Sequence, residues 1–179
     1  MSKRITLISY MEQTELDKIK SLMSNINMKT CKVPYGIDDD NRYNIDNLPY
    51  HITIFANNKD KQYEMIYLTK KTNIDKIEIK VNDIKIMKGR YDSFVLYLSI
   101  EDNSEIRNLQ RIFFKEFPNE KYNPDDFTFH ITLDIDKDYN KVVELQKQLK
   151  KNFKSFYLKF NKLALYDYPG DLIKIINMK

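Results

Sequence analysis

LPYHITIF at residues 48–55 and FTFHITLD at residues 127–134 contain the only two histidines of this 179-residue chain. Each histidine, His51 and His130, precedes the same dipeptide, Ile-Thr. Apolar and polar residues alternate around both, which is typical of β-strands that bury one face. Because residues i and i+2 of a strand project from the same face, each histidine and its threonine are predicted to point one way and the intervening isoleucine the other.

The sequence around the two histidines repeats over a longer range. IEIKVNDIKIM at residues 77–87 and FYLKFNKLALY at residues 156–166 both begin 26 positions after a histidine. Apolar stripes at helical spacing predict four helices, at residues 14–28, 59–72, from about 104 onward and 138–152. The order strand, helix, strand, helix, strand therefore occurs twice. We expect one domain over residues 1–179, built of two similar lobes that face each other, with repeat halves of roughly 1–90 and 91–179.

Bulk composition is that of a globular chain. Hydrophobic residues make up 42% and aromatic residues 13%, which is enough apolar material to bury a core. The net charge of +4 allows an anionic partner without requiring one. The single cysteine, Cys31, cannot form an internal disulfide, and no apolar run reaches the roughly 18 residues of a membrane span. The N-terminus has the pattern of a strand and not of a signal peptide, so we expect a cytoplasmic protein that does not enter the membrane.

The four polar residues of the two motifs, His51, Thr53, His130 and Thr132, form a set suited to phosphodiester chemistry. If an approximate two-fold axis relates the lobes, both polar strand faces meet. One imidazole can then take a proton from the attacking oxygen while the other donates one to the leaving oxygen. The threonine hydroxyls can donate hydrogen bonds to the phosphate oxygens. A single His-x-Thr carries little information, but two copies in register with a repeat predict a site.

The residues near the two histidines do not favour a metal site. No Asp, Glu or Cys lies near the histidines at metal-ligand spacing, and the acidic run at residues 38–40 is simplest as a solvated loop, so no metal and no cofactor is predicted. The long loop of residues 30–49 offers Tyr35, Arg42 and Tyr43 to stack a base or hold a phosphate. Tyr122 has a comparable place before the second motif. Ordinary surface residues remain the alternative for all four.

Strand alternation also predicts the surroundings of the motifs. Tyr50 and Phe129 adjoin the histidines but should face the core, so base stacking is not expected of them. By the same alternation, Asp134 should share a face with His130.

Two H-x-T motifs 79 residues apart, each ahead of a helix and a strand, resemble the 2H phosphoesterase superfamily, which includes the LigT-like 2'-5' RNA ligases and the RNA cyclic phosphodiesterases. The resemblance spans essentially the whole chain. It implies an α+β fold with two lobes of antiparallel sheet, outer helices and a central cleft. It also implies His51 and His130 as catalytic residues, with His130 activating water and His51 protonating the leaving oxygen, and Thr53 and Thr132 as phosphate contacts. Many LigT-like members carry an arginine after the second motif, where this chain has Asp134 and Asp136.

The expected function is a metal-independent phosphodiesterase that hydrolyses a 2',3'-cyclic phosphate or a 2'-5' phosphodiester in RNA or nucleotides, acting as a monomer. Three alternatives stay open. They are a 2'-5' RNA ligase, a hydrolase of cyclic or 2'-5' oligonucleotide signals, and a non-catalytic module that binds RNA or a nucleotide.

Overall fold

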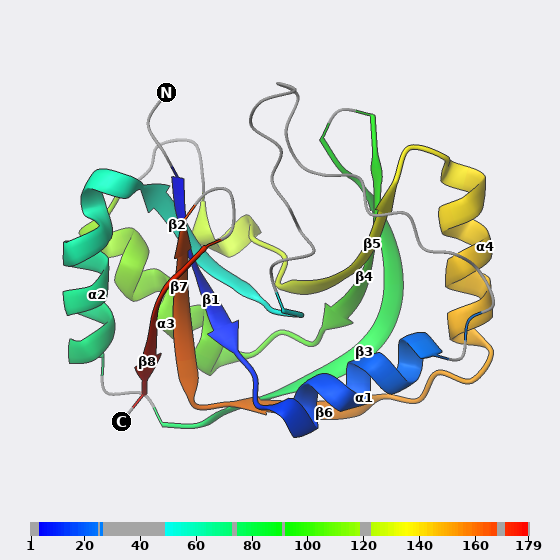
Figure 1. The fold of residues 1–179 in the computed structure, drawn as a ribbon, viewed down its shortest axis with the longest axis horizontal. Coiled ribbons are helices and arrows are strands. Elements are labelled where there is room, and N and C mark those ends of the chain that lie inside the picture. The colour runs from blue at the N-terminus through cyan, green and yellow to red at the C-terminus, as the bar shows by residue number, and fades with distance from the viewer. Residues whose placement is uncertain are drawn as a thin grey trace.

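The protein folds into two four-stranded antiparallel sheets with helices packed against them (Figure 1). The structure, a computed structural model, describes residues 4–24, 26, 49–72, 75–90, 92–118, 123–167 and 171–178. Sheet A has the strand order β2-β1-β7-β8 and comprises β1 (Arg4–Tyr10), β2 (Thr53–Asn58), β7 (Lys162–Asp167) and β8 (Leu172–Asn177). Sheet B has the order β5-β4-β3-β6 and comprises β3 (Ile77–Lys88), β4 (Phe94–Ile100), β5 (His130–Asp136) and β6 (Phe156–Phe160).

The helices lie close to their predicted positions. They are α1 (Gln13–Ser24), α2 (Gln62–Lys71), α3 (Ser104–Glu116) and α4 (Tyr139–Lys150), with short 3-10 turns at Lys59–Lys61 and Pro124–Asp126. Side-chain caps fix two of the starts, because Asn103 accepts hydrogen bonds from the first backbone N–H groups of α3 and Asp138 does the same for α4. The α+β class with antiparallel sheets and outer helices is confirmed. No described helix combines the length and apolar character needed to cross a membrane.

A two-fold relation between the halves shows in the strand pairing. Ile52 forms an isolated antiparallel bridge with Ile131, and Ile79 pairs with Leu158 where β3 meets β6. The members of each pair lie 79 positions apart, as the two histidines do, so at both places a residue meets its own counterpart. A residue pairs with its own counterpart only where an approximate two-fold axis passes between them. Both residue pairs therefore lie on such an axis.

The sheets do not follow the halves of the sequence. The end of β3, Val81–Lys88, pairs with β4 of the second half, whereas its counterpart β7 pairs with β1 of the first half. Each sheet thus takes strands from both halves, which ties the halves together by backbone hydrogen bonds.

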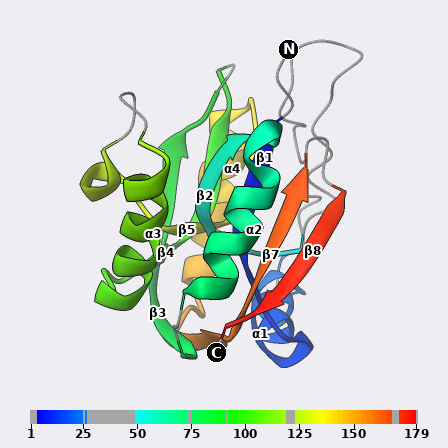
Figure 2. The ribbon, with the colours of Figure 1, turned by 90° about the vertical axis from the view of Figure 1, so that its left-hand side faces the viewer.

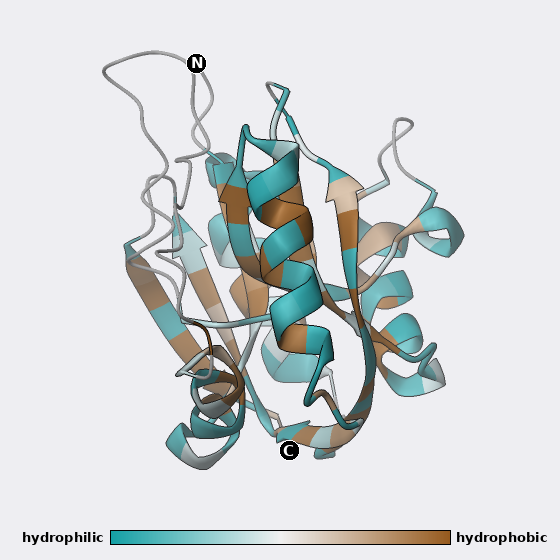
Figure 3. Cartoon of the chain, turned by 90° about the vertical axis from the view of Figure 1, so that its right-hand side faces the viewer, coloured by the Kyte–Doolittle hydropathy of each residue, from teal (hydrophilic) through white to brown (hydrophobic). Residues whose placement is uncertain are grey.

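The main core lies between the sheets and their covering helices. On sheet A, α2 and α3 lie over the outer face (Figure 2), where Phe55 of β2 contacts the rings of Phe113, Phe114 and Phe117. On sheet B, α4 covers the outer face (Figure 3) and buries Val142, Leu145 and Leu149. Helix α1 covers the edge of β6.

Side chains of α1 satisfy backbone groups on that edge strand. Glu15 accepts a hydrogen bond from the N–H of Lys159 at 3.0 Å, and Lys18 donates to the carbonyl oxygen of Tyr157 at 2.9 Å. Because an open strand edge invites pairing with another chain, these contacts protect sheet B.

Candidate active site

The two motifs alternate in the structure as their sequences predict. Ile52, Ile54, Ile131 and Leu133 are buried in the core. The four residues between and beside them, His51, Thr53, His130 and Thr132, are all partly exposed. We call the side of the strands that carries these four residues the motif face.

The bridge between Ile52 and Ile131 brings the motifs together. In an antiparallel bridge the residues that flank one partner lie opposite those that flank the other. His51 is therefore opposite Thr132, and Thr53 is opposite His130. Each histidine lies beside the threonine of the other half, and the structure assembles the four predicted site residues in one place.

A β-bulge follows each motif threonine. In sheet A, Thr53 pairs with Ile8 but Phe55 pairs with Leu7, so Ile54 is the extra residue. In sheet B, Thr132 pairs with Tyr97 but Asp134 pairs with Leu96, so Leu133 is extra. A bulge shifts the alternation by one residue, which turns the position after it to the other face.

The prediction that Asp134 shares a face with His130 is wrong, and this bulge is the reason. Asp134 lies on the core side beside Leu96 and is only 3% exposed. Burial, and then the charge of Asp134, raise the pKa of the Tyr50 hydroxyl. The carboxylate therefore lies behind the motif strands, on the side away from the motif face.

The predicted orientations of Tyr50 and Phe129 are confirmed. Phe129 is buried in the main core, and Tyr50 packs against that core while half-buried. Neither ring lies on the motif face.

Both histidine rings are held by the same kind of hydrogen bond. Nδ1 of His51 lies 2.7 Å from the carbonyl oxygen of Pro49, and Nδ1 of His130 lies 2.8 Å from that of Thr128. A carbonyl oxygen only accepts, so Nδ1 must carry the hydrogen in each ring. In the neutral tautomer this leaves the lone pair on Nε2, which can take up a proton and later release it.

The environment lowers the pKa of both imidazoles. Burial is the main cause for His51; the Pro49 carbonyl opposes it, and the charge of His130 lowers this pKa further. Burial also lowers the pKa of His130, against the opposing hydrogen bond to Thr128. A proton on His130 also disfavours a proton on His51, so the titrations of the two rings are coupled.

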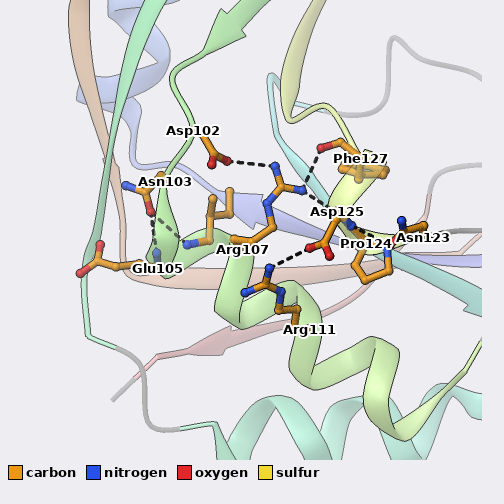
Figure 4. Close-up of polar contacts among 10 residues, drawn as sticks. Asp102, Asn103, Glu105, Arg107, Arg111, Asn123, Pro124, Asp125 and Phe127 are labelled. Carbon is orange, nitrogen blue, oxygen red and sulfur yellow. Dashed lines mark hydrogen bonds and ion pairs between the residues drawn. The ribbon is translucent and has the colours of Figure 1, made fainter.

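Helix α3 supports both motifs through side chains that the sequence pattern does not single out. Figure 4 shows the contacts of one of them, Arg107. The guanidinium of Arg107 donates from Nη1 to the carbonyl oxygens of Pro124 at 2.7 Å and Phe127 at 2.9 Å, and from Nη2 to Asp102 at 2.9 Å. It also lies over the ring of Phe129, 4.7 Å from the centroid. Arg107 therefore fixes the segment that leads into His130.

One turn further along α3, buried Gln110 donates from Nε2 to the carbonyl oxygen of Ile54 at 3.3 Å. That oxygen belongs to the bulged residue directly after Thr53. The only sequence signal for Arg107 and Gln110 was their spacing of three beside the apolar stripe of a helix, which is too common to indicate a role.

The remaining predicted contacts, Tyr35, Arg42, Tyr43 and Tyr122, lie outside the described residues. Within the parts of the chain that the structure describes, no three His, Cys, Asp or Glu side chains group so as to hold a metal ion.

The comparison with protein families agrees with the paired motifs. A family model for the 2'-5' RNA ligase superfamily matches residues 38–172. The chain belongs to this superfamily. No curated protein matches the sequence.

Solved structures with the same fold cover the whole chain. A phosphoesterase crystal structure aligns with a TM-score of 0.64 at 11% identity, covering 100% of this chain and 99% of its own. Escherichia coli LigT complexed with 3'-AMP aligns at 0.59 and 12% identity, covering 100% and 97%. Kluyveromyces marxianus Usb1 with uridine monophosphate aligns at 0.54 and 8% identity, covering 99% and 97%. At these identities the similarities establish the fold of the chain.

Proposed function

We propose that the protein is a metal-independent phosphodiesterase that hydrolyses a 2',3'-cyclic phosphate or a 2'-5' phosphodiester in RNA or nucleotides. One observation carries the proposal. Two imidazoles with identical Nδ1–H bonds to carbonyl oxygens lie on strands joined at Ile52 and Ile131, each beside a threonine of the other motif. Membership of the 2'-5' RNA ligase superfamily supports it.

The chemistry uses Nε2 of each ring. In the active form one imidazole is neutral and the other protonated. The neutral Nε2 takes a proton from water as its oxygen forms a bond to phosphorus. The protonated Nε2 gives its proton to the ribose oxygen as the bond from phosphorus to that oxygen breaks. One proton enters the pair and one leaves it, so the pair's net charge is unchanged, with the proton now on the other ring.

The threonines stabilise the charge that builds up on the phosphate. The hydroxyls of Thr53 and Thr132 donate hydrogen bonds to the two non-bridging oxygens, which become more negative as water attacks. These donors are held on strands, so little reorganisation is needed when the reaction occurs.

A 2'-5' RNA ligase is the second candidate, and the superfamily assignment is the observation that favours it. By microscopic reversibility the same pair can deprotonate a ribose hydroxyl and protonate the departing oxygen of a cyclic phosphate. Hydrolase and ligase therefore differ in which acceptor, water or RNA, reaches the phosphorus.

The test uses substitutions that preserve the ring's structural bond. An asparagine amide can still donate to the carbonyl two residues earlier but has no group at the position of Nε2. We expect His51→Asn and His130→Asn to lower kcat by about 10²–10⁴-fold on 2',3'-cyclic nucleotides or on 2'-5' dinucleotides, with EDTA present.

Controls for this test are 3'-5' dinucleotides as substrates and the melting temperature of each variant. RNA ends bearing a 2',3'-cyclic phosphate and a 5'-hydroxyl test for ligation. Equal activity of wild type and both variants on every substrate would falsify the catalytic role and leave a binding module.

A further inference from the structure

The motif face continues across sheet B beyond the two histidines. Thr132 of β5 pairs with Tyr97 of β4, and Tyr97 pairs in turn with Lys85 of β3. Paired residues of antiparallel strands project from the same side of the sheet. Thr132, Tyr97 and Lys85 therefore form one row on the motif face.

Lys85 is an exposed cation in this row. Its neighbours Ile84 and Ile86 turn toward the core, which directs Lys85 to the motif face. Asp83, the nearest acid along β3, forms its ion pair with Lys150 of α4 at 2.9 Å. Against the effect of burial, the hydrogen bond to Lys150 and, more weakly, the charge of Lys85 lower the pKa of Asp83. Lys85 itself forms no direct ion pair with any residue in the described part of the chain.

Tyr97 separates the cation from the reacting groups and contacts one of them. Its ring meets the imidazole of His130 edge to face, with centroids 5.4 Å apart, and it is only 7% exposed. Neighbouring strands lie about 4.8 Å apart, so the backbone of Lys85 is about 10 Å from that of Thr132. The flexible four-carbon stem of a lysine can cross much of this gap over the tyrosine.

The equivalent row of sheet A carries no charge. Thr53 pairs with Ile8, Ile8 with Ala164, and Ala164 with Ile175. Ala164, 79 positions after Lys85, is the counterpart of the lysine. The two sides of the site therefore differ: the row beside His130 ends in a cation, whereas the row beside His51 is apolar.

We propose that Lys85 binds a second phosphate of the substrate, next to the one that reacts. This inference rests on the proposed function and narrows its substrate to an RNA end or oligonucleotide that carries a further phosphate. The reacting phosphate lies against His51, Thr53, His130 and Thr132, and the strand continues over Tyr97 toward the Lys85 ammonium. A nucleoside 2',3'-cyclic phosphate without that second phosphate leaves Lys85 unused.

Two substrates separate this binding role from a general charge effect. Uridine 2',3'-cyclic phosphate carries one phosphate, and its 5'-phosphorylated form carries two. We expect Lys85→Gln to lower kcat/KM for the two-phosphate substrate by about 10- to 100-fold, mainly through KM, because a hydrogen bond to a charged group is lost. For the one-phosphate substrate we expect a change of less than about twofold, because no contact to Lys85 is involved.

Lys88→Gln is the matched control, since Lys88 is an exposed lysine of the same strand whose side chain belongs to the opposite face. Lys88→Gln should leave the preference for the two-phosphate substrate unchanged. Lys85→Arg, which keeps the positive charge, should retain most of that preference. Equal losses on both substrates, or the same loss in Lys88→Gln, would overturn the proposal.

A binding measurement keeps this inference distinct from the proposed activity. Calorimetry should show that uridine 3',5'-bisphosphate binds the wild-type protein more tightly than uridine 3'-monophosphate, and that Lys85→Gln removes the difference. If the two ligands bind equally, the Lys85 site is disproved, whatever the activity. If the difference depends on Lys85 but His51→Asn and His130→Asn retain full activity, the Lys85 site stands and the catalytic proposal fails.

Discussion

His51 and His130 show how a strand can prepare an imidazole for proton transfer. The carbonyl oxygen two residues earlier holds Nδ1–H in each ring, while partial burial lowers the pKa of both. The bond fixes the tautomer, and burial keeps the free pair from taking up two protons at neutral pH.

The pH dependence of activity follows from these shifts. Both pKa values lie below the ordinary 6.5. The form with one proton is therefore lost before the pH reaches 6.5, so the basic limb of the kcat/KM profile should have its midpoint below pH 6.5. A bound phosphate favours the protonated rings, so the limb for kcat should lie at higher pH than the limb for kcat/KM.

Initial rates between pH 4.5 and 9 in buffers of constant ionic strength test this expectation. A basic limb for kcat/KM above pH 6.5, or a profile without one, contradicts it.

At the scale of elements, α3 acts as a support for both motifs. Arg107 holds the segment before His130, and Gln110 holds the bulge after Thr53. These side chains touch no reacting atom, so their effect on the reaction passes through the position of the motif residues.

Arg107 gives a prediction that separates positioning from stability. Arg107→Ala should lower the free energy of unfolding by about 1.5–3 kcal/mol, because hydrogen bonds to a charged group are lost. It should also lower kcat more than it raises KM. The NMR titration of His130 should shift, whereas that of His51 should change little. Arg107→Lys should recover only part of the activity, because an ammonium cannot reproduce the planar fork of a guanidinium.

Arg111→Ala is the control on the same helix. Arg111 pairs with Asp125 at 2.7 Å, but both side chains are more than half exposed, and such pairs contribute about 0–1 kcal/mol. If Arg111→Ala changes kcat and the His130 titration as much as Arg107→Ala does, the positioning role of Arg107 is refuted.

The same elements show where sequence patterns stop being informative. Alternation correctly placed Ile52, Ile131 and the motif residues because those positions lie before the bulges. It misplaced Asp134 because Leu133 and Asp134 continue an apolar-polar pattern, and no residue type there marks an extra position in the ladder. The supports from α3 were missed because they depend on contacts between segments distant in sequence.

At the scale of the molecule, the duplication was predictable but the exchange of strands was not. The spacing of 79 residues between the repeats fixed the equivalence of the halves. The end of β3 and its counterpart β7 have the same apolar-polar alternation. The sequence therefore does not predict that β7 pairs with β1 while the end of β3 pairs with β4. Which sheet each strand joins depends on hydrogen bonds between strands of different halves, which are distant in sequence.

Exchange of strands predicts how the halves behave when separated. Fragments 1–90 and 91–179 divide the chain between β3 and β4. Each loses a pairing partner of its third strand, so neither should unfold cooperatively alone. Mixed at equal concentration, they should form a 1:1 complex with recovered activity, measured by size exclusion and turnover. A monomeric fragment 1–90 with a cooperative thermal transition would show that the exchanged strands are dispensable.

Phe55 and Asp134 occupy the same place after the two bulges, yet one is aromatic and the other acidic. Two identical chains around a true dyad would have to carry the same residue twice, either two rings or two buried carboxylates. Joining both copies in one polypeptide removes that requirement. One copy can keep an aromatic that anchors α3 while the other places a charge behind the site, beside Tyr50. The fused chain can therefore accept mutations that a homodimer could not, and the two halves of a nearly symmetric site can diverge in what they recognise.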